Sequence, residues 1–165
     1  MNVLIRPAKP SDVRKISAIV EPYAARRILL NRELVSYFEA ISEFFVAEVD
    51  GEVVGCGALH VLWEDLAEVR SLAVEQSHLG TGLGHGLMMA LLERARHYEL
   101  ARVFCLTFEV DFFTSLGFSV IDGAPVTPEV YAELLRSPDD HVAEFLDLAR
   151  VKPNTLGNSR MLLTL

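Results

Sequence analysis

Apolar residues in the first half of the chain recur with two spacings, which predict alternating strands and helices. Continuous apolar runs are typical of buried strands, and apolar residues three or four positions apart are typical of a helix with one buried face. The pair Asp50-Gly51 between two apolar runs indicates a two-residue hairpin turn. The expected elements are a strand Val3–Arg6, a helix begun at Pro10-Ser11-Asp12 with Ser11 as its cap and apolar positions Val13, Ile16, Val20 and Tyr23, a second helix marked by Leu34, Tyr37, Phe38 and Ile41, a hairpin of Phe44–Val49 and Glu52–Leu62, and a strand from about Leu66 to Val74.

The second half of the chain continues this alternation. Thr127-Pro128-Glu129 places a cap, a proline and an acid in the order that favours a helix start. Asp139 to Val151 fits a helix or a strand equally well. The other expected elements are a helix with the buried stripe Leu87, Met88, Leu91, Leu92 and Ala95 that ends near Tyr98, a strand Arg102–Thr107, a short helix Glu109–Leu116 stopped by Gly117-Phe118, and a final strand Ser159–Leu163. This order predicts an α/β fold.

Length, composition and charge favour one folded domain over residues 1–165. A chain of 165 residues with 51% hydrophobic content is long enough to bury one sizeable core. It has no apolar run near the ~20 residues that cross a bilayer, and its first residues lack the features of a secretory signal. A net charge of -8 argues against binding to nucleic acid or to an anionic membrane, since either would need a broad basic surface.

The cysteines and histidines give no signal for a disulfide or a metal site. Cys56 and Cys105 lie in apolar, strand-like runs, so we expect buried free thiols in a reducing compartment, with the cytoplasm as the default. The histidines show no metal-ligand spacing and are expected to be surface or capping groups. His85 alone is close enough to a glycine-rich segment to touch a bound phosphate.

That glycine-rich segment follows an apolar strand and opens a helix. Gly80, Gly82 and Gly84 leave the first backbone N–H groups of the helix unscreened, at the positive end of the helix dipole. Such a loop favours a bound diphosphate. The glycine spacing does not fit the dinucleotide fingerprint, and the segment lacks the lysine of a P-loop. We therefore expect a phosphorylated cofactor of another kind.

Leu72-Ala73-Val74 followed by Leu79-Gly80-Thr81-Gly82-Leu83-Gly84 resembles the acetyl-coenzyme A motif of the GNAT N-acetyltransferases, in which Gln/Arg-x-x-Gly-x-Gly/Ala follows a strand ending in Leu-Ala-Val. The resemblance implies a mixed central sheet flanked by helices and acetyl-CoA as cosubstrate. Leu79 stands where the family has glutamine or arginine, so one side-chain contact to phosphate is lost while the backbone amides remain. The cofactor-binding residues that the resemblance implies are Leu72, Ala73, Val74, Leu79, Gly80, Thr81, Gly82, Gly84 and His85.

Further segments are similar to the acetyltransferase domain of N-acetylglutamate synthase, and the match covers nearly the whole chain. It implies transfer of acetyl from acetyl-CoA to the α-amine of L-glutamate by direct attack in a ternary complex, as the first step of arginine biosynthesis. Bifunctional members carry a preceding amino-acid-kinase domain that mediates arginine feedback, and we do not expect that domain here. The similar segments are Ile28–Leu34, Phe45–Glu48, Val54–Leu59, Glu68–Val74, Phe112–Phe118 and Asn158–Leu162.

Two arginines and a serine are predicted to bind the acceptor. Glutamate carries two carboxylates, which the planar fork of arginine matches. The resemblance places Arg32, at the head of the second expected helix, and Arg160, on the last strand, at cationic positions of the family's substrate site. Ser159 and Lys152 are weaker candidates. Each arginine can also be interpreted as a surface side chain that covers apolar neighbours.

Glu68 is predicted to be the general base. An α-amine with a pKa of ~8 or somewhat higher is mostly protonated at neutral pH, so a group must accept its proton. The alternation of side chains along a strand is expected to place Glu68 and Arg70 on the same side as Leu72 and Val74, beside the arm of the cofactor. An ion pair between Glu68 and Arg70 is the alternative interpretation.

Thr107 is predicted to donate a proton to the leaving thiolate, directly or through water. Many GNAT enzymes have a tyrosine just before the Gly-Phe pair for this purpose, whereas this chain has Phe113 in that segment. The reaction also needs donors for the oxyanion, which main-chain N–H groups from Leu72 to Val74 could supply.

Three other functions stay open at this point. Glutamine or another small amine could be the acceptor. The chain could instead be a non-catalytic acyl-CoA sensor, which the absent tyrosine and Leu79 favour. It could also be an interaction module in an oligomer, and the sequence leaves a homodimer open.

Overall fold

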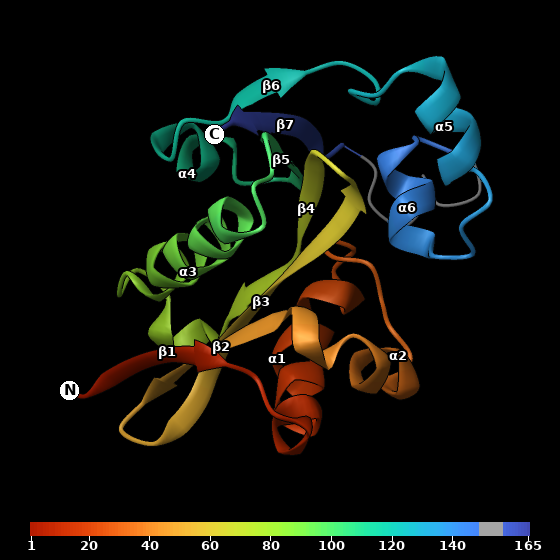
Figure 1. Cartoon of the computed structure of the whole chain (residues 1–165). Coiled ribbons are helices and arrows are strands. Elements are labelled where there is room, and N and C mark those ends of the chain that lie inside the picture. Colours follow the sequence, from red (N-terminus) through yellow and green to blue (C-terminus); the bar gives the residue numbers. More distant parts are fainter. Residues whose placement is uncertain (149–156) are drawn as a thin grey trace.

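The computed structural model describes residues 1–148 and 157–165 and contains a seven-stranded sheet with helices on both faces (Figure 1). The strand order is β1-β2-β3-β4-β5-β7-β6, and β4 and β5 are the pair that runs parallel. The strands are β1 (Val3–Pro7), β2 (Phe44–Val49), β3 (Glu52–Trp63), β4 (Leu66–Val74), β5 (Arg102–Thr107), β6 (Ser119–Ile121) and β7 (Ser159–Thr164). The helices are α1 (Val13–Ala25), α2 (Leu34–Glu39), α3 (Leu83–His97), α4 (Val110–Ser115), α5 (Pro128–Leu134) and α6 (Asp140–Phe145).

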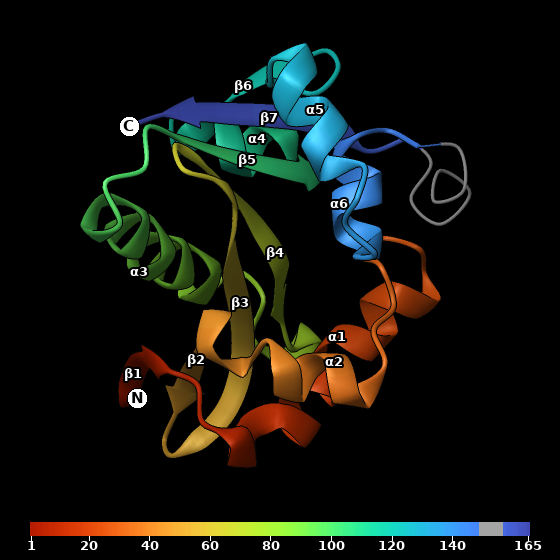
Figure 2. The ribbon, with the colours of Figure 1, turned by 45° about the vertical axis from the view of Figure 1, so that its right-hand side comes forward.

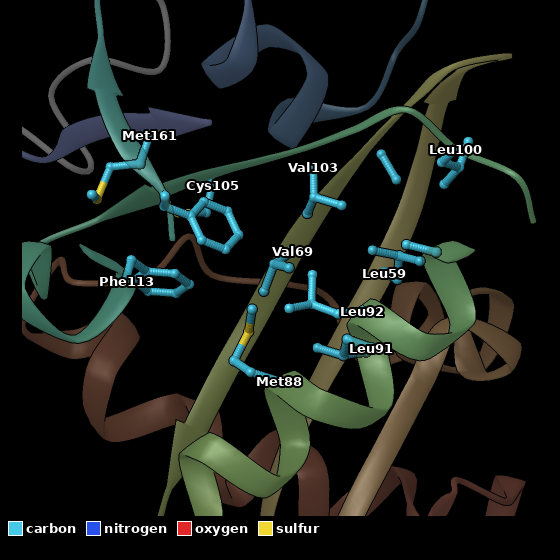
Figure 3. Close-up of a cluster of buried hydrophobic side chains, with 13 residues drawn as sticks. Leu59, Val69, Met88, Leu91, Leu92, Leu100, Val103, Cys105, Phe113 and Met161 are labelled. Atoms are coloured by element: carbon cyan, nitrogen blue, oxygen red, sulfur yellow. The ribbon is translucent and has the colours of Figure 1, made fainter. Parts of the chain in front are cut away.

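Helices α3 and α4 cover one face of the sheet, and the other helices cover the opposite face (Figure 2). Figure 3 shows the first layer, in which Met88, Leu91 and Leu92 of α3 point at Leu59 and Val69 of the sheet. The helical spacing of these residues therefore gives α3 its buried side, as the sequence predicts. On the other face, α1 and α2 pack on β2 and β3, and α5 and α6 pack on the end of β3, the start of β4 and β5.

The hairpin between β2 and β3 follows from its two turn residues. Asp50 and Gly51 have φ of 51° and 84°, and Val49 pairs with Glu52 across the turn. A two-residue turn with both φ angles positive matches the twist of the strands that it joins. The predicted hairpin is confirmed.

Strands β4 and β5 separate, and this separation makes room for the site. Their parallel pairing covers three residue pairs, from Leu66 opposite Arg102 to Glu68 opposite Phe104. In Figure 2 the two strands start side by side and then run apart. Within residues 1–148 and 157–165, the β5-facing backbone of β4 after Glu68 consequently has no neighbouring strand.

Several element boundaries differ from the sequence-based expectation. Ser11 is not the cap of α1: it lies within a 3₁₀ turn, Pro10–Asp12, and α1 begins at Val13. The carboxylate of Asp12 accepts a hydrogen bond from the Lys9 N–H at 2.7 Å. Ile41, expected in the second helix, lies in a separate 3₁₀ turn after it.

The carboxyl-terminal part also departs in detail. Strand β6 was not expected from the sequence, since its three residues are largely exposed and show no apolar run. The segment that fitted a helix or a strand contains α6, whose N-cap Asp139 accepts from the N–H groups of His141 and Val142. The remainder of that segment, 149–151, lies outside the described residues, as does Lys152. The predicted start of α5 is confirmed, because the Thr127 hydroxyl accepts from the Val130 N–H.

Candidate active site

A cavity of about 720 Å³ fills the gap between β4 and β5. Its walls come from the whole of β4 after Ala67, the end of β5, the loop before α3, and the start of α6. All the residues predicted to bind the cofactor line it, and so do both predicted catalytic residues: Glu68, Leu72, Ala73, Val74, Leu79, Gly80, Thr81, Gly82, Gly84, His85 and Thr107. The fold therefore brings these residues to one place.

The glycine-rich loop has an open backbone facing this cavity. Gly80 and Gly82 have φ of 75° and 85°, a region that favours glycine, and no atom lies within 4 Å of where a Cβ would sit. Gly82 is the N-cap of α3, and the first backbone hydrogen bond of the helix runs from the Gly86 N–H to the Gly82 carbonyl. The N–H groups ahead of Gly86 thus have no partner within the helix, which suits an anion.

Side chains around the loop add little charge of their own. Leu79 is 55% exposed beside the cavity, and the Thr81 hydroxyl donates to the His78 carbonyl. Binding of an anion here therefore depends on the backbone and the helix dipole.

A β-bulge in β4 corrects the expected alternation. Ala58 pairs with Arg70 and Cys56 pairs with Ala73, so two residues of β4 lie opposite Gly57. One of these is Ser71, whose φ is 53°. The extra residue moves Leu72 and Val74 to the face covered by α3, away from the face of Glu68 and Arg70.

Glu68 is buried beside an arginine. It is 2% exposed, and its Oε1 accepts a hydrogen bond from Nε of Arg70 at 2.8 Å. Burial raises the pKa of Glu68, and Arg70 opposes this rise only in part. The ion pair considered as an alternative role is present, and the raised pKa leaves the carboxylate a better proton acceptor than an ordinary glutamate.

Arg70 is itself held by a second carboxylate. Its Nη1 donates to Oδ2 of Asp139 at 3.2 Å, and 1% of its side chain is exposed. Although burial acts to raise it, the charges of Arg70 and His141 lower the pKa of Asp139 to about 2. The N-cap of α6 thereby fixes the arginine that holds Glu68.

Thr107 lies at the end of β5, opposite Ser159 of β7. Its hydroxyl oxygen accepts a hydrogen bond from the Glu109 N–H at 2.8 Å, so the hydroxyl keeps its own proton for another partner. Phe113 lines the cavity nearby, in contact with Phe112 and Phe118. Among Thr107 and these three phenylalanines, the Thr107 hydroxyl is the group that can donate a proton.

Arg32 lies in a second, more polar cavity of about 450 Å³, lined by the segment before and including α2, by His60 of β3 and by the start of α6. Its guanidinium stands over the rings of Tyr37 and Phe44, 5.5 Å from each centroid. Burial and then the nearby charge of Arg70 lower the pKa of Arg32. Arg70 and His141 line both cavities, so the two are neighbours.

The structure gives Arg160 a different surrounding from that expected. Its guanidinium donates to the main-chain carbonyls of Gly123, Glu144 and Phe145, and it stands over the ring of Phe104. These bonds tie β7 to α6, and Arg160 lines neither cavity. Each of its three nitrogens donates to a main-chain carbonyl, so its guanidinium is held against the backbone of the wall.

Sequence reasoning missed Asp139 and misjudged His141. We expected His141 to be a surface or capping group, but only 12% of its side chain is exposed and it lines both cavities. Burial, followed by the charges of Arg70 and Arg32, lowers its pKa well below the usual value. The run Ser137-Pro138-Asp139-Asp140 carries the cap signal that could have located this helix start.

The two cysteines agree with the sequence-based expectation. Cys56 and Cys105 are both free and buried, which confirms the prediction of buried free thiols. Within residues 1–148 and 157–165, no cluster of three or more His, Cys, Asp or Glu side chains is arranged to hold a metal ion. In the same residues, no helix combines the length and the apolar character needed to span a membrane.

Comparison with known sequences finds similarity to acetyltransferases. A family model described as the acetyltransferase (GNAT) family matches residues 13–118, more than half of the chain. An amino-acid acetyltransferase of Mycobacterium tuberculosis is 54% identical, over 98% of this chain and 94% of that protein. An amino-acid acetyltransferase of Neisseria meningitidis serogroup A is 34% identical, over 70% of this chain but 27% of that longer protein.

Comparison with solved structures agrees. The crystal structure of Rv2747 from Mycobacterium tuberculosis in complex with CoA and the compound NLQ has a TM-score of 0.95 at 55% identity, covering 98% of this chain and 99% of that one. N-acetylglutamate synthase from Neisseria gonorrhoeae, complexed with coenzyme A and N-acetyl-glutamate, has a TM-score of 0.79 at 25% identity, covering 100% of this chain and 35% of that one. These similarities confirm the predicted fold class, a mixed central sheet flanked by helices.

Proposed function

The chain belongs to the acetyltransferase (GNAT) family, and we propose that it transfers the acetyl group of acetyl-CoA to the α-amine of L-glutamate. The observation that carries the proposal is one cavity in which an open glycine loop and a buried carboxylate, Glu68, meet. The similarity to an N-acetylglutamate synthase that was crystallised with coenzyme A and N-acetyl-glutamate supports glutamate as the acceptor. On this proposal, the chain acts in the first step of arginine biosynthesis, in the cytoplasm, as a single domain.

The residues of the cavity fit acetyl-CoA. The backbone of Gly80, Gly82 and Gly84 would hold the diphosphate, since no side chain screens the first N–H groups of α3. Among the described residues, no strand pairs with the β5-facing edge of β4 after Glu68, so this edge would bind the amide-containing arm of the coenzyme. The Val74 carbonyl is already used, because it accepts from the Tyr23 hydroxyl at 2.6 Å. Bound acetyl-CoA supplies an acetyl group activated as a thioester.

Two side chains would move protons. Glu68 accepts the proton of the acceptor's α-amine, because its raised pKa increases its affinity for a proton. Thr107 donates a proton towards the departing thiolate. A thiol has a pKa of ~8.5, so this leaving group needs less help than an alkoxide would. Main-chain N–H groups from Leu72 to Val74, which line the cavity after the bulge at Ser71, would stabilise developing negative charge on the acetyl oxygen.

Arg32 would bind the acceptor, and Ser159, opposite Thr107 on β7, is a weaker candidate. Arg32 suits a carboxylate because its guanidinium is largely removed from water and stands at the neighbouring polar cavity. The bonds of Arg160 to three carbonyls favour a different role for it, as a brace for the wall of the site.

Release of the thiol of CoA, followed with free L-amino acids as acceptors, tests the proposal. We expect release that depends on acetyl-CoA and on L-glutamate, and a mass-spectrometric product that is N-acetylglutamate. Glu68→Gln should lower kcat by about 10² to 10⁴, which is the range for loss of a general base. Glu93→Gln, a change of the same kind at an exposed position of α3, should leave kcat unchanged.

A melting temperature and a CoA affinity for Glu68→Gln separate loss of chemistry from loss of fold. If Glu68→Gln binds CoA and turns over like the unaltered protein, then Glu68 is not the base. If no amino acid stimulates thiol release, the proposed function is wrong.

A further inference from the structure

Two buried guanidinium nitrogens lack an acceptor. Among the residues that the structure describes, Nη1 of Arg32 and Nη2 of Arg70 are the buried side-chain nitrogen or oxygen atoms without a hydrogen-bond partner. A buried donor without an acceptor is costly, and more so when the group carries a charge. Both atoms therefore call for an anionic ligand at this place.

The orientation of Arg70 is fixed by its other two nitrogens. Nε donates to Glu68 at 2.8 Å and Nη1 donates to Asp139 at 3.2 Å, from opposite ends of the planar group. Nε and Nη2 form one edge of a guanidinium, and their N–H bonds point in nearly the same direction. A group bound to Nη2 consequently lies next to the carboxylate oxygen of Glu68.

The two arginine charges also favour an anion between them. Arg32 and Arg70 line the same polar cavity, and the charge of Arg70 lowers the pKa of Arg32. The carboxylates Glu33, Glu39, Glu43, Asp139 and Asp140 line this cavity too. The two of them that act on the charge of Arg32 already have partners: Glu43 contacts Nδ1 of His60 at 2.9 Å, and Asp139 accepts from Arg70. A carboxylate placed between the two arginines would offset their repulsion.

We propose that Nη1 of Arg32 and Nη2 of Arg70 together bind the α-carboxylate of the acceptor amino acid. This inference rests on the proposed function and assigns Arg70 a role in specificity. In an α-amino acid, one carbon separates the amine from the α-carboxylate, which matches an arginine that contacts the base Glu68 directly. The enzyme would accordingly select free α-amino acids and reject amines without an adjacent carboxylate.

Paired acceptors that differ in one group test this assignment. L-isoglutamine is glutamate with only its α-carboxylate changed to an amide, and L-glutamine is glutamate with only its side-chain carboxylate changed. For the unaltered protein we expect kcat/KM to be about 100-fold lower with L-isoglutamine than with L-glutamate, because two hydrogen bonds to charged groups are lost. The α-amine of L-isoglutamine is less basic than that of L-glutamate, so a larger fraction of it is unprotonated. This difference acts against the expected loss in kcat/KM.

Arg32→Gln shows whether the arginines cause the effect. In this variant the loss on going from L-glutamate to L-isoglutamine should shrink from about 100-fold to about tenfold, since one of the two donors is already absent. Arg136→Gln, at an exposed arginine of the surface near α5, should keep the full loss. Calorimetric titration of acceptors into the CoA-bound protein gives the same comparison without turnover, and melting temperatures exclude misfolding of the variant.

The results distinguish the two proposals. Equal kcat/KM for L-isoglutamine and L-glutamate, with thiol release still dependent on amino acid, would overturn the α-carboxylate site and leave the proposed function standing. The variant could instead keep the loss with L-isoglutamine and change only the ratio of kcat/KM between L-glutamate and L-glutamine. In that case the arginines bind the side-chain carboxylate and the inference is wrong. Absence of release with every α-amino acid would reject the proposed function itself.

Discussion

At the scale of single residues, the site depends on a buried carboxylate that remains able to accept a proton. The Glu68 carboxylate accepts a hydrogen bond from Arg70, and burial raises the pKa of Glu68 above the usual value in spite of that bond. Arg70 cannot take a proton from it, since a guanidinium has no acceptor capacity. Arg70 therefore orients the carboxylate and leaves proton transfer to Glu68.

The raised pKa of Glu68 predicts the pH dependence of turnover. As the pH falls through that pKa, Glu68 becomes protonated and can no longer accept a proton, so kcat/KM should begin to fall at a higher pH than an ordinary glutamate would give. Protonation of the acceptor's α-amine lowers kcat/KM further as the pH falls, in the variant as well as in the unaltered protein. A plot of log kcat/KM against pH should therefore be steeper, by about one unit of slope, than the same plot for Glu68→Gln. Identical slopes for both proteins would contradict the role of Glu68.

At the scale of elements, the start of α3 contains a glycine in the left-handed region and a glycine in the helix. Gly82 has φ of 85°, whereas Gly84 is already helical, and a Cβ on it would lie 3.7 Å from the ring of Phe112. Gly82→Ala should lower the free energy of unfolding by about 1 kcal/mol because of its left-handed backbone. Gly84→Ala should leave it unchanged or raise it, because alanine favours a helix.

Both substitutions should weaken CoA binding, since each adds a Cβ where the diphosphate would approach the backbone. Denaturant unfolding and calorimetric titration with CoA measure the two effects separately. A normal CoA affinity in both variants would show that the diphosphate binds elsewhere.

The packing of α3 predicts a second contrast. Leu91 is fully buried against the sheet, and Met89 on the opposite side of the same helix is 41% exposed. Leu91→Ala should lower the free energy of unfolding by about 2–5 kcal/mol, because it removes buried contacts and leaves a cavity. Met89→Ala should change it by about 0.5 kcal/mol or less. Urea unfolding of the two variants measures this, and similar losses would contradict the packing shown in Figure 3.

The elements also show where sequence reasoning succeeds and where it fails. The glycine loop, the Asp50-Gly51 turn and the apolar side of α3 are local patterns, and all could be predicted. The bulge at Ser71 could not, because an extra residue in a strand depends on the register of its neighbours. The sequence suggested an ion pair of Arg70 with Glu68, two positions away, but not its pairing with Asp139, which depends on a contact between residues 69 positions apart.

At the scale of the whole molecule, function depends on how the sheet separates into two parts. The short pairing of β4 with β5 leaves a gap that the sheet cannot close, and the cavity forms there. The chain carries a net charge of -8, yet Arg70 and the amino-terminal end of α3 line this gap, and Arg32 lines the neighbouring cavity. Local positive potential in an acidic protein suits small anionic substrates.

We propose that the protein acetylates one free amino acid in the cavity between β4 and β5. A competition experiment tests this proposal most directly. The protein is incubated with acetyl-CoA and an equimolar mixture of the common L-amino acids, and the acetylated products are measured by mass spectrometry. The account predicts N-acetylglutamate as the main product, formed in the same amount as free CoA. Release of CoA with no acetylated amino acid, or a main product other than N-acetylglutamate, would contradict it.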